Sequence, residues 1–280
     1  MLTGQPATLL GRILNIPPLR GREVCELHLN PAGNTLVAET ADHVVRVAWC
    51  APMDIECEAR MWAEAVRVGI PAPELVASGT LDGHQYMVYT RLAGWPEPTS
   101  AAVLDEAGIK LAALHEAATH VFPRQLVARP RRMNRFALAR SFLRRHVEHV
   151  SPGVVDCVEL AELDWTCSFH TPTHGDFRGS NLLARGLKLS GVLDWSDARR
   201  ASREADLGGV DWPRFRRVLG GYLTVCPDVR GAELLGYFVG RHAALAEAGV
   251  IGRHSALRVI DLCAQELTGR RLLDMGSAYR

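Results

Sequence analysis

The feature that most constrains the fold of this 280-residue chain is a polar loop followed by an apolar hairpin. The loop, residues 174–181, reads His-Gly-Asp-Phe-Arg-Gly-Ser-Asn, and a second apolar run after Gly186 leads directly into Asp194. The return strand of a hairpin ends beside the start of its first strand, close to the loop that precedes the hairpin. We therefore expect Asp176, Asn181 and Asp194 to come together in space.

These three polar residues form the set that phosphoryl transfer requires. One carboxylate orients the attacking hydroxyl group and accepts its proton, while an asparagine and an aspartate hold magnesium against the phosphates of a nucleotide. Asp176, Asn181 and Asp194 follow one another in that order. The three-residue pattern alone would arise by chance in on the order of one in a hundred such chains, and turn chemistry favours Asp and Asn in loops in any case. The second aspartate at a strand end makes the catalytic interpretation the better one.

The first part of the chain is rich in predicted strands. Residues 24–47 alternate apolar and polar side chains around turn-forming clusters, which predicts a short antiparallel meander. Apolar residues recur at helical spacing in residues 55–66, and two further strand-like runs cover residues 74–78 and 84–89. We assign residues 1–90 to a small β-rich N-terminal lobe that binds a nucleotide.

The rest of the chain is predicted to be mainly helical. Residues 94–98, Gly-Trp-Pro-Glu-Pro, break regular structure and indicate a crossing between lobes. Apolar residues then follow helical spacing in residues 103–118, in residues 129–150 and again in the C-terminal region. We assign residues 91–280 to a larger helical lobe that carries the catalytic loop and the substrate site. The predicted fold class is therefore α+β, with two lobes.

The composition does not identify a binding partner, but it excludes several classes of protein. Charged residues make up 22% of the chain and the net charge is +1, which excludes a strongly basic nucleic-acid scaffold. We interpret the arginines of residues 129–145 as a solvated helix face and expect no nucleic-acid partner. The 7 cysteines are scattered and predict neither a zinc site nor a disulfide framework. No apolar run has the length of a membrane span or a signal sequence, so we expect no membrane partner and a cytoplasmic location.

At the polar loop the chain resembles the aminoglycoside phosphotransferase family. Residues 174–176 (His-Gly-Asp) and 194–195 (Asp-Trp) match that family's catalytic loop and metal-binding segment more closely than those of protein kinases. Residues 111–115 (Leu-Ala-Ala-Leu-His) are similar to its helix before the catalytic loop. Residues 204–207 (Glu-Ala-Asp-Leu) are similar to its segment after the metal-binding aspartate, and the resemblance extends over most of the chain.

The resemblance implies a protein-kinase-like fold with the nucleotide bound between the two lobes. Asp176 would be the catalytic base, and Asn181 and Asp194 would be the magnesium ligands. His174 would fix the loop, and Asp206 would be structural. The phosphoryl donor would be ATP or GTP, the cofactor Mg²⁺, and the acceptor a small molecule with a hydroxyl group.

Members of the family carry a strand lysine or arginine paired with a helix glutamate. This chain has only two lysines, Lys110 and Lys188, and offers Arg46 at the strand position. Glu58 would be its partner, with Glu56 as the alternative. Arginine binds carboxylate or phosphate through two parallel hydrogen bonds, although its geometry differs from that of lysine. A solvated strand arginine is the competing interpretation of Arg46.

The resemblance also places the nucleotide site in the N-terminal lobe. Residues 30–35 would be the phosphate-covering loop, and residues 85–94 would be the hinge. Tyr89 would line the purine pocket, while backbone groups of Thr90 and Leu92 would bind the base.

Three functions stay open at this point. The resemblance implies an antibiotic O-phosphotransferase. A kinase of an endogenous small alcohol, such as an amino alcohol, amino acid or sugar, would share the same fold and site chemistry. A catalytically inactive homologue that only binds a nucleotide or a protein is the third, and the intact catalytic set argues against it. A polycationic antibiotic would favour an acidic cleft, and the C-terminal region is slightly basic. This favours a less cationic antibiotic, such as a nucleoside or a macrolide, and a basic antibiotic bound in a locally acidic pocket stays the alternative.

Overall fold

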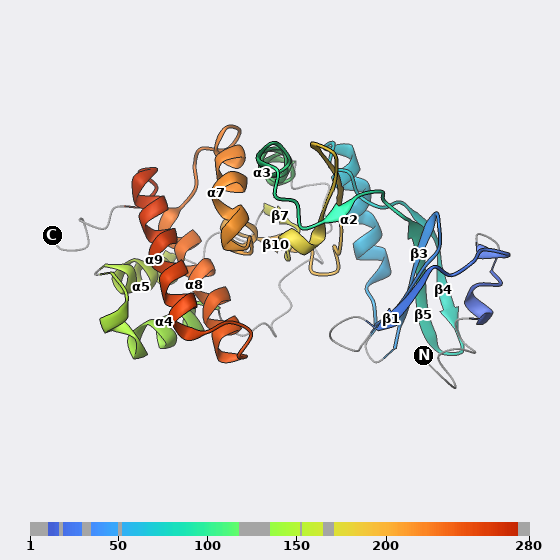
Figure 1. Cartoon of the computed structure of the whole chain (residues 1–280), viewed down its shortest axis with the longest axis horizontal. Helices are drawn as coiled ribbons and strands as arrows, with labels where there is room; N and C mark the ends of the chain where they lie inside the picture. Colours follow the sequence, from blue (N-terminus) through green and yellow to red (C-terminus); the bar gives the residue numbers. More distant parts are fainter. Residues whose placement is uncertain are drawn as a thin grey trace.

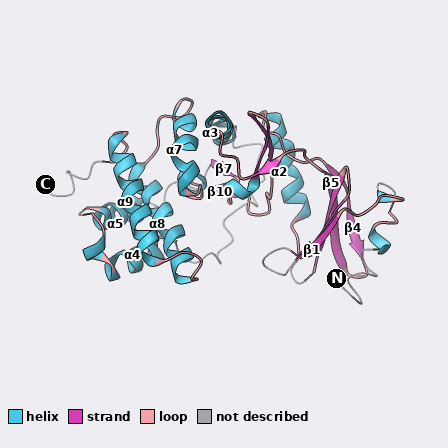
Figure 2. Cartoon of the chain, in the orientation of Figure 1, coloured by secondary structure: helices cyan, strands magenta, loops and turns pink. Residues whose placement is uncertain are grey.

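The computed structural model describes residues 11–16, 19–29, 35–49, 52–117, 135–151, 153–164 and 171–273. The molecule is elongated, with the strands of the N-terminal part at one end and the C-terminal helices at the other (Figure 1, Figure 2). This architecture confirms the predicted α+β class. Among the described residues, β5 (His84–Thr90) is the last strand of the main sheet along the chain, and the helices from α3 (Ala101–Glu116) onward follow it. The division of the chain at residue 90 stays a prediction.

The main sheet has five antiparallel strands in the order β1-β2-β3-β5-β4. Besides β5, they are β1 (Glu26–Leu29), β2 (Thr35–Glu39), β3 (His43–Ala48) and β4 (Leu75–Leu81). The predicted meander corresponds to the first three strands, and the two further predicted strands correspond to β4 and β5. These predictions are confirmed.

Side chains along β3 alternate between two environments. Val45 and Val47 lie in a small core that also contains Ile13 and Leu19. Successive residues of a strand point to opposite faces of the sheet. Arg46, between the two valines, therefore faces the other side of the sheet, where α2 (Ile55–Arg67) packs.

Helix α2 presents its buried face to the sheet. Asp54 caps the helix, because its carboxylate accepts a hydrogen bond from the backbone N–H of Cys57 at 3.2 Å and so satisfies one of the free donors of the first turn. Trp62 meets the ring of Tyr89 edge-on, with the ring centroids 5.2 Å apart. Glu58 lies on the same buried face of the helix.

A three-stranded sheet contains the predicted hairpin. Strands β8 (Leu182–Arg185) and β9 (Lys188–Val192) pair antiparallel, and the glycine in their turn, Gly186, has a φ of +63°. The short strand β6 (Trp95–Pro96), from the segment predicted to break regular structure, pairs with β8. A separate pair, β7 (Thr171–Thr173) and β10 (Arg199–Ala201), joins the start of the polar loop to the segment after the hairpin.

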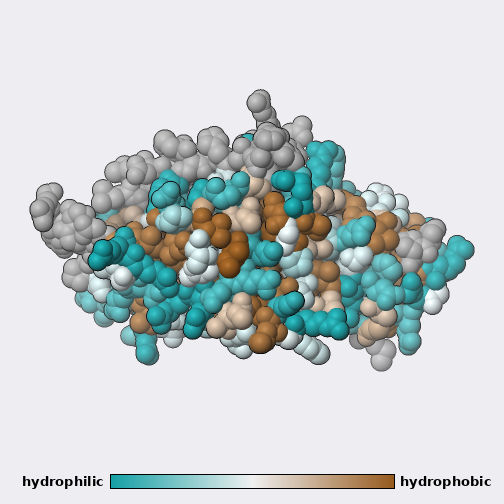
Figure 3. Space-filling model, turned by 90° about the horizontal axis from the view of Figure 1, so that it is seen from above, coloured by the Kyte–Doolittle hydropathy of each residue, from teal (hydrophilic) through white to brown (hydrophobic). Residues whose placement is uncertain are grey.

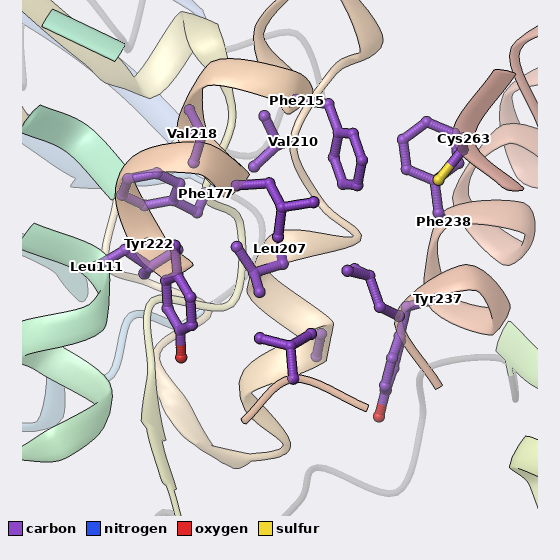
Figure 4. Packing of buried hydrophobic residues seen from close by; sticks show 14 of the residues in the cluster. Leu111, Phe177, Leu207, Val210, Phe215, Val218, Tyr222, Tyr237, Phe238 and Cys263 are labelled. Carbon is purple, nitrogen blue, oxygen red and sulfur yellow. The ribbon is translucent and has the colours of Figure 1, made fainter. Parts of the chain in front are cut away.

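The C-terminal part is built from helices around one apolar core. They are α3, α4 (Arg135–Arg145), α5 (Val154–Asp164), α6 (Arg203–Leu207), α7 (Trp212–Leu223), α8 (Gly231–Glu247) and α9 (Arg253–Gly269), with 3₁₀ turns η2 (Val147–His149) and η4 (Gly179–Asn181). Phe177 of the polar loop lies in this core near Leu111 and Val218 (Figure 4). Of the helix predicted over residues 129–150, α4 and η2 are observed, and residues 129–134 lie outside the described residues.

Among the described residues, no helix combines the length and the apolar character needed to cross a membrane. Seen from above, the surface is largely hydrophilic, and apolar side chains form several separate groups on it (Figure 3). This distribution agrees with a composition that is 48% apolar and 22% charged.

Candidate active site

A cleft of about 500 Å³ lies between the main sheet and the β8–β9 hairpin. Strands β1, β2, β3 and β5 and helix α2 contribute one side, and η4, β8 and the end of the hairpin contribute the other. Every predicted site residue except Asp176 lines the cleft: Arg46, Glu58, Tyr89, Thr90, Leu92, Asn181 and Asp194. Residues from distant parts of the sequence thus meet around one space.

Asp176 lies next to this cleft and is bound to its lining. Asn181 Nδ2 donates hydrogen bonds to the Asp176 carboxylate Oδ2 at 3.2 Å and to the Asp176 backbone carbonyl at 2.9 Å. The Nε of Arg178 lies 3.1 Å from the same carboxylate oxygen. These donors fix the orientation of the carboxylate. Its side chain is 20% exposed, so it stays accessible to a hydroxyl group.

His174 connects the loop to the end of the hairpin. Its Nδ1 accepts a hydrogen bond from the backbone N–H of Asp176 at 3.2 Å, and its Nε2 donates to the carbonyl of Leu193 at 2.9 Å. The backbone N–H of Leu193 in turn donates to the carbonyl of Asn181 at 2.8 Å. The loop and the residue before Asp194 are therefore joined directly, which is the loop-fixing position expected for His174.

A buried brace holds the loop from the other side, and sequence reasoning missed part of it. Asp206 accepts hydrogen bonds from the backbone N–H groups of His174 and Gly175, each at 2.7 Å. His115, to which we gave no role, donates from Nε2 to Asp206 at 3.1 Å and accepts a bond of 2.8 Å from the hydroxyl of Tyr222. Both residues lie in segments whose sequence resembles that of the family. This resemblance was the signal that could have identified the brace. The brace attaches the loop to α3, α6 and α7.

The charge of Asp206 matters for this brace. Burial by itself would raise the pKa of Asp206, but the hydrogen bond and charge of His115, with His174 and Gly175, hold that pKa below its ordinary value. The carboxylate is thus ionised at neutral pH and acts purely as an acceptor. It satisfies two backbone donors that would otherwise be buried without a partner.

Arg46 of β3 and Glu58 of α2 form a buried ion pair. The Nη1 of Arg46 lies 2.6 Å from Oε1 of Glu58, and the side chains are 15% and 3% exposed. Burial lowers the pKa of Arg46, but the ion pair with Glu58, together with Tyr89 and Asp194, outweighs burial and holds that pKa above its ordinary value. Burial raises the pKa of Glu58, and the charge of Arg46 opposes that rise. The alternative acid, Glu56, is exposed and pairs with Arg60 on the same helix.

Asp194 has an unusual backbone conformation, with a φ of +57°. This left-handed region costs a non-glycine residue about 1–2 kcal/mol, which points to a functional constraint. One carboxylate oxygen, Oδ1, accepts a hydrogen bond from Ser196 Oγ at 2.7 Å. Because the amide nitrogen of Asn181 is bound to Asp176, its amide oxygen is the group left for another partner.

Oxygen ligands of this kind suit magnesium, which usually takes one or two protein groups and completes its shell with phosphate oxygens and water. Asn181 and Asp194 line the same cleft and fit such a site. Their role as ligands stays a prediction. The described ranges contain no group of three or more His, Cys, Asp or Glu side chains that could hold a metal ion alone.

The residues predicted to form the hinge differ in the groups that they offer to a ligand. The backbone N–H of Thr90 is engaged, since it donates to the carbonyl of Glu74 at 3.0 Å. The N–H of Leu92 makes no hydrogen bond with the described residues and is left for a ligand. Tyr89 is half-buried, and burial of its hydroxyl group raises its pKa, so the hydroxyl stays protonated. The phosphate-covering loop predicted at residues 30–35 lies, apart from its last residue, outside the described residues.

Comparison with protein families identifies the group to which this site belongs. Residues 34–223, more than half of the chain, match the model of the phosphotransferase enzyme family. The chain belongs to this phosphotransferase family. The resemblance seen at the polar loop is confirmed, and the protein is a kinase-like enzyme that acts on hydroxyl groups of small molecules. A search of curated protein sequences finds no match to the chain.

Solved structures of other phosphotransferases share the fold. A thermostable mutant of aminoglycoside phosphotransferase APH(4)-Ia, in ternary complex with AMP-PNP and hygromycin B, is 15% identical over 92% of this chain and 98% of that one, with a TM-score of 0.60. Spectinomycin phosphotransferase APH(9)-Ia, in complex with ADP and spectinomycin, is 13% identical over 98% and 100%, with a TM-score of 0.61. A choline/ethanolamine kinase family protein from Mesorhizobium loti is 19% identical over 98% and 99%, with a TM-score of 0.57.

Proposed function

We propose that this phosphotransferase is a cytoplasmic, Mg²⁺-dependent kinase that transfers the γ-phosphate of a nucleoside triphosphate to a hydroxyl group of an antibiotic. The observation that carries the proposal is the meeting of Asp176, Asn181 and Asp194 at the hairpin side of the cleft. A space of about 500 Å³ is within the range of small-molecule sites. In this proposal residues 1–90 bind the nucleotide and residues 91–280 bind the acceptor.

Each residue then has a defined task. The carboxylate of Asp176 accepts the proton of the attacking hydroxyl group, and Asn181 and Arg178 keep it in place. Asn181 and Asp194 hold Mg²⁺, which when bound neutralises charge on the phosphates. Arg46, fixed by its ion pair, donates charge-assisted hydrogen bonds to phosphate oxygens from the sheet side of the cleft.

The donor is proposed to be ATP or GTP. Two of the similar structures contain AMP-PNP or ADP, which supports a nucleotide donor. Tyr89 and the free N–H of Leu92 lie at the part of the cleft where a base would be held. The sheet side of the cleft, which includes Arg46, would then meet the phosphates.

Two acceptor classes have support. The hygromycin B and spectinomycin complexes of the similar enzymes favour an antibiotic. The choline/ethanolamine kinase family structure, similar over 98% of this chain, favours an endogenous small alcohol as the second candidate. A catalytically inactive homologue is the third, and the complete set of Asp176, Asn181 and Asp194 opposes it.

Product formation tests the proposed activity and the role of Asp176. Purified protein with Mg²⁺ and ATP or GTP is given a panel of antibiotics and small metabolic alcohols, and each product is identified by its mass. We expect Asp176→Asn to reduce kcat by about 10²-fold or more, since proton transfer by a positioned base contributes about that factor. Nucleotide affinity should stay within about twofold of the wild-type value. Wild-type turnover in the Asp176→Asn protein would refute this role.

Nucleotide binding tests the magnesium site separately. Asp194→Asn should weaken binding of the Mg²⁺–nucleotide complex, because a charged oxygen ligand is lost, while leaving binding of the metal-free nucleotide unchanged. Asparagine tolerates the left-handed backbone of this position, so the fold should persist. Titration calorimetry with and without Mg²⁺ measures the difference, and equal magnesium dependence in both proteins would place the metal elsewhere.

A further inference from the structure

Arg241, on α8, carries a half-buried positive charge that the roles proposed above do not use. Its Nε is buried and has no hydrogen-bond partner among the described residues. Removing a charged group in part from water without giving it a partner is unfavourable. Charged groups desolvated in this way cluster at functional sites.

The position of α8 directs this charge toward the catalytic loop. Phe238, three residues earlier on the same helix face, packs against the ring of Phe215, with the centroids 5.1 Å apart (Figure 4). The ring of Phe238 also lies 6.1 Å from that of Trp212 between centroids. The backbone of Phe238 contacts Gly208, and the neighbouring Gly209 lies against the carbonyl of Phe177, the residue after Asp176. One further turn of α8 places Arg241 on this side of the helix.

The electrostatics agree with that placement. Burial lowers the pKa of Arg241 below its ordinary value, while Asp176 and Asp211 oppose the shift and Arg178 adds to it. The carboxylates near Arg241 are already engaged. Arg178 is bound to Asp176, and Asp211 accepts a bond of 3.0 Å from the N–H of Gly179 and forms an ion pair with Arg214. The positive charge of Arg241 is therefore not neutralised within the loop region.

Arg241 also lies outside the cleft that is assigned to the nucleotide. From the loop, Ser180 and Asn181 line the cleft. Neither Asp176 nor Arg241 is part of its lining. A nucleotide in the cleft thus approaches the loop from the hairpin side. Arg241 interacts electrostatically with Asp176 and, like Asp176, does not line the cleft, so a hydroxyl group that approaches Asp176 from outside the cleft would come near Arg241.

We propose that Arg241 binds an anionic oxygen group, such as a carboxylate, on the acceptor molecule, and so selects hydroxyl compounds that carry a negative charge near the phosphorylated position. This inference rests on the proposed function and specifies its substrate class. It makes a cationic amino alcohol or a polycationic aminoglycoside a poor acceptor, because both would meet Arg241 and Arg178 with like charge.

The test uses three six-carbon polyols that differ in one terminal group: gluconate (carboxylate), glucitol (hydroxymethyl) and 1-amino-1-deoxyglucitol (ammonium). Affinities are measured by titration calorimetry with the full chain saturated in Mg²⁺ and ADP, so that the nucleotide site is filled. We expect gluconate to bind at least about tenfold more tightly than glucitol, the factor that one charge-assisted hydrogen bond supplies, and the ammonium compound to bind most weakly. Equal affinity across the series, or no binding of gluconate, would overturn the proposal.

Variants assign the preference to one side chain. Arg241→Gln should abolish the preference for gluconate, and Arg241→Lys should keep it in weaker form. The matched control is Arg217→Gln, on α7, whose side chain is 61% exposed; it should keep the full preference. If Arg241→Gln kept the preference, Arg241 would not be the anion-binding residue.

Thermal unfolding without ligand is a second, independent test of whether Arg241 lacks a partner in the folded protein. A half-buried charge without a partner destabilises the folded protein, so Arg241→Gln should raise Tm by up to roughly 2–4 °C. An arginine paired within the chain would give a lower Tm on replacement, and that result would contradict the proposal. The proposed function is tested separately by the product-formation assay. If that function is wrong, no acceptor will give an Asp176-dependent product. Asp176-dependent product with neutral or cationic acceptors alone would overturn only the anion preference.

Discussion

Gly175 shows why one position of the catalytic loop must lack a side chain. Its φ is +86°, and a Cβ atom there would lie 2.1 Å from the carbonyl oxygen of Asp197. Its N–H is at the same time bound to the buried carboxylate of Asp206. The backbone conformation, the close approach of Asp197 and the brace all depend on glycine at this position.

Replacing Gly175 with alanine should therefore displace the loop that carries Asp176. We expect kcat to fall by about 10²-fold, the effect of a shift of roughly 1 Å at a reacting group, with a loss of at least about 1–2 kcal/mol in the free energy of unfolding. Steady-state kinetics and urea unfolding measure the two effects.

Gly186 is the matched control for this prediction. It also has a positive φ, +63°, but no atom lies within 4 Å of the position that a Cβ would occupy. Gly186→Ala should lose a similar backbone free energy and keep its kcat. A comparable loss of kcat in both variants would show that strain alone, and not the contact with Asp197, impairs the loop.

The residues of the catalytic loop were predictable because their relation is local. Asp176, Asn181 and Asp194 belong to one loop and the hairpin that follows it, so spacing and turn chemistry fix their neighbourhood. The bond between His115 and Asp206 joins residues 91 positions apart and depends on how α3 packs beside α6. No local pattern contains that information.

At the scale of elements, helices and strands with regular apolar spacing could be predicted, whereas the pairing of very short strands could not. Helix α2 and strand β3 have regular apolar spacing, and both lie where the sequence placed them. Strand β6 has only two residues, and its partner β8 lies far along the chain, with Trp95 opposite Ala184. The choice of Glu58 over Glu56 likewise depends on which face of α2 meets the sheet.

The ion pair between β3 and α2 leads to a prediction about stability. Arg46→Ala should cost about 3–5 kcal/mol in unfolding free energy, because it leaves the carboxylate of Glu58 buried without a partner. Replacing Arg46 and Glu58 together by methionine should recover most of that loss, since apolar residues of similar size fill the space. Urea unfolding of the single and double variants measures the coupling. A double variant as unstable as the single one would contradict this account.

An exposed pair provides the control for this experiment. Arg12 and Asp82 form an ion pair with side chains that are 55% and 44% exposed. Arg12→Ala should cost less than about 1 kcal/mol, because water screens the charges and solvates the partner that remains. The contrast between the two pairs separates the effect of burial from the loss of an arginine.

For the whole molecule, His242 predicts how stability depends on pH. Burial lowers the pKa of His242 to about 4, against the opposing hydrogen bond to the carbonyl of Phe238. Between pH 6.5 and pH 4 the unfolded chain therefore binds a proton at this residue that the folded chain does not bind. Stability should fall as the pH is lowered through that range, by up to about 3 kcal/mol in total.

His242→Asn tests the source of this dependence. Asparagine keeps a donor near the carbonyl of Phe238 but does not titrate. The slope of unfolding free energy against pH should decrease by about 1.4 kcal/mol per pH unit near pH 5, the contribution of one proton. Denaturant unfolding at a series of pH values measures the slope. An identical slope in the wild-type and His242→Asn proteins would assign the acid sensitivity to other groups.

The presence of Arg46 on the sheet side of the cleft has a practical consequence for detecting the enzyme. The two lysines of the chain are Lys110 and Lys188, and neither lines the cleft. Nucleotide reagents that transfer an acyl group to a nearby amine need a lysine, and a guanidinium group stays protonated and does not replace it. Chemical surveys that find kinases by acylating their nucleotide sites would therefore leave this enzyme unlabelled, even in an extract where it is fully active.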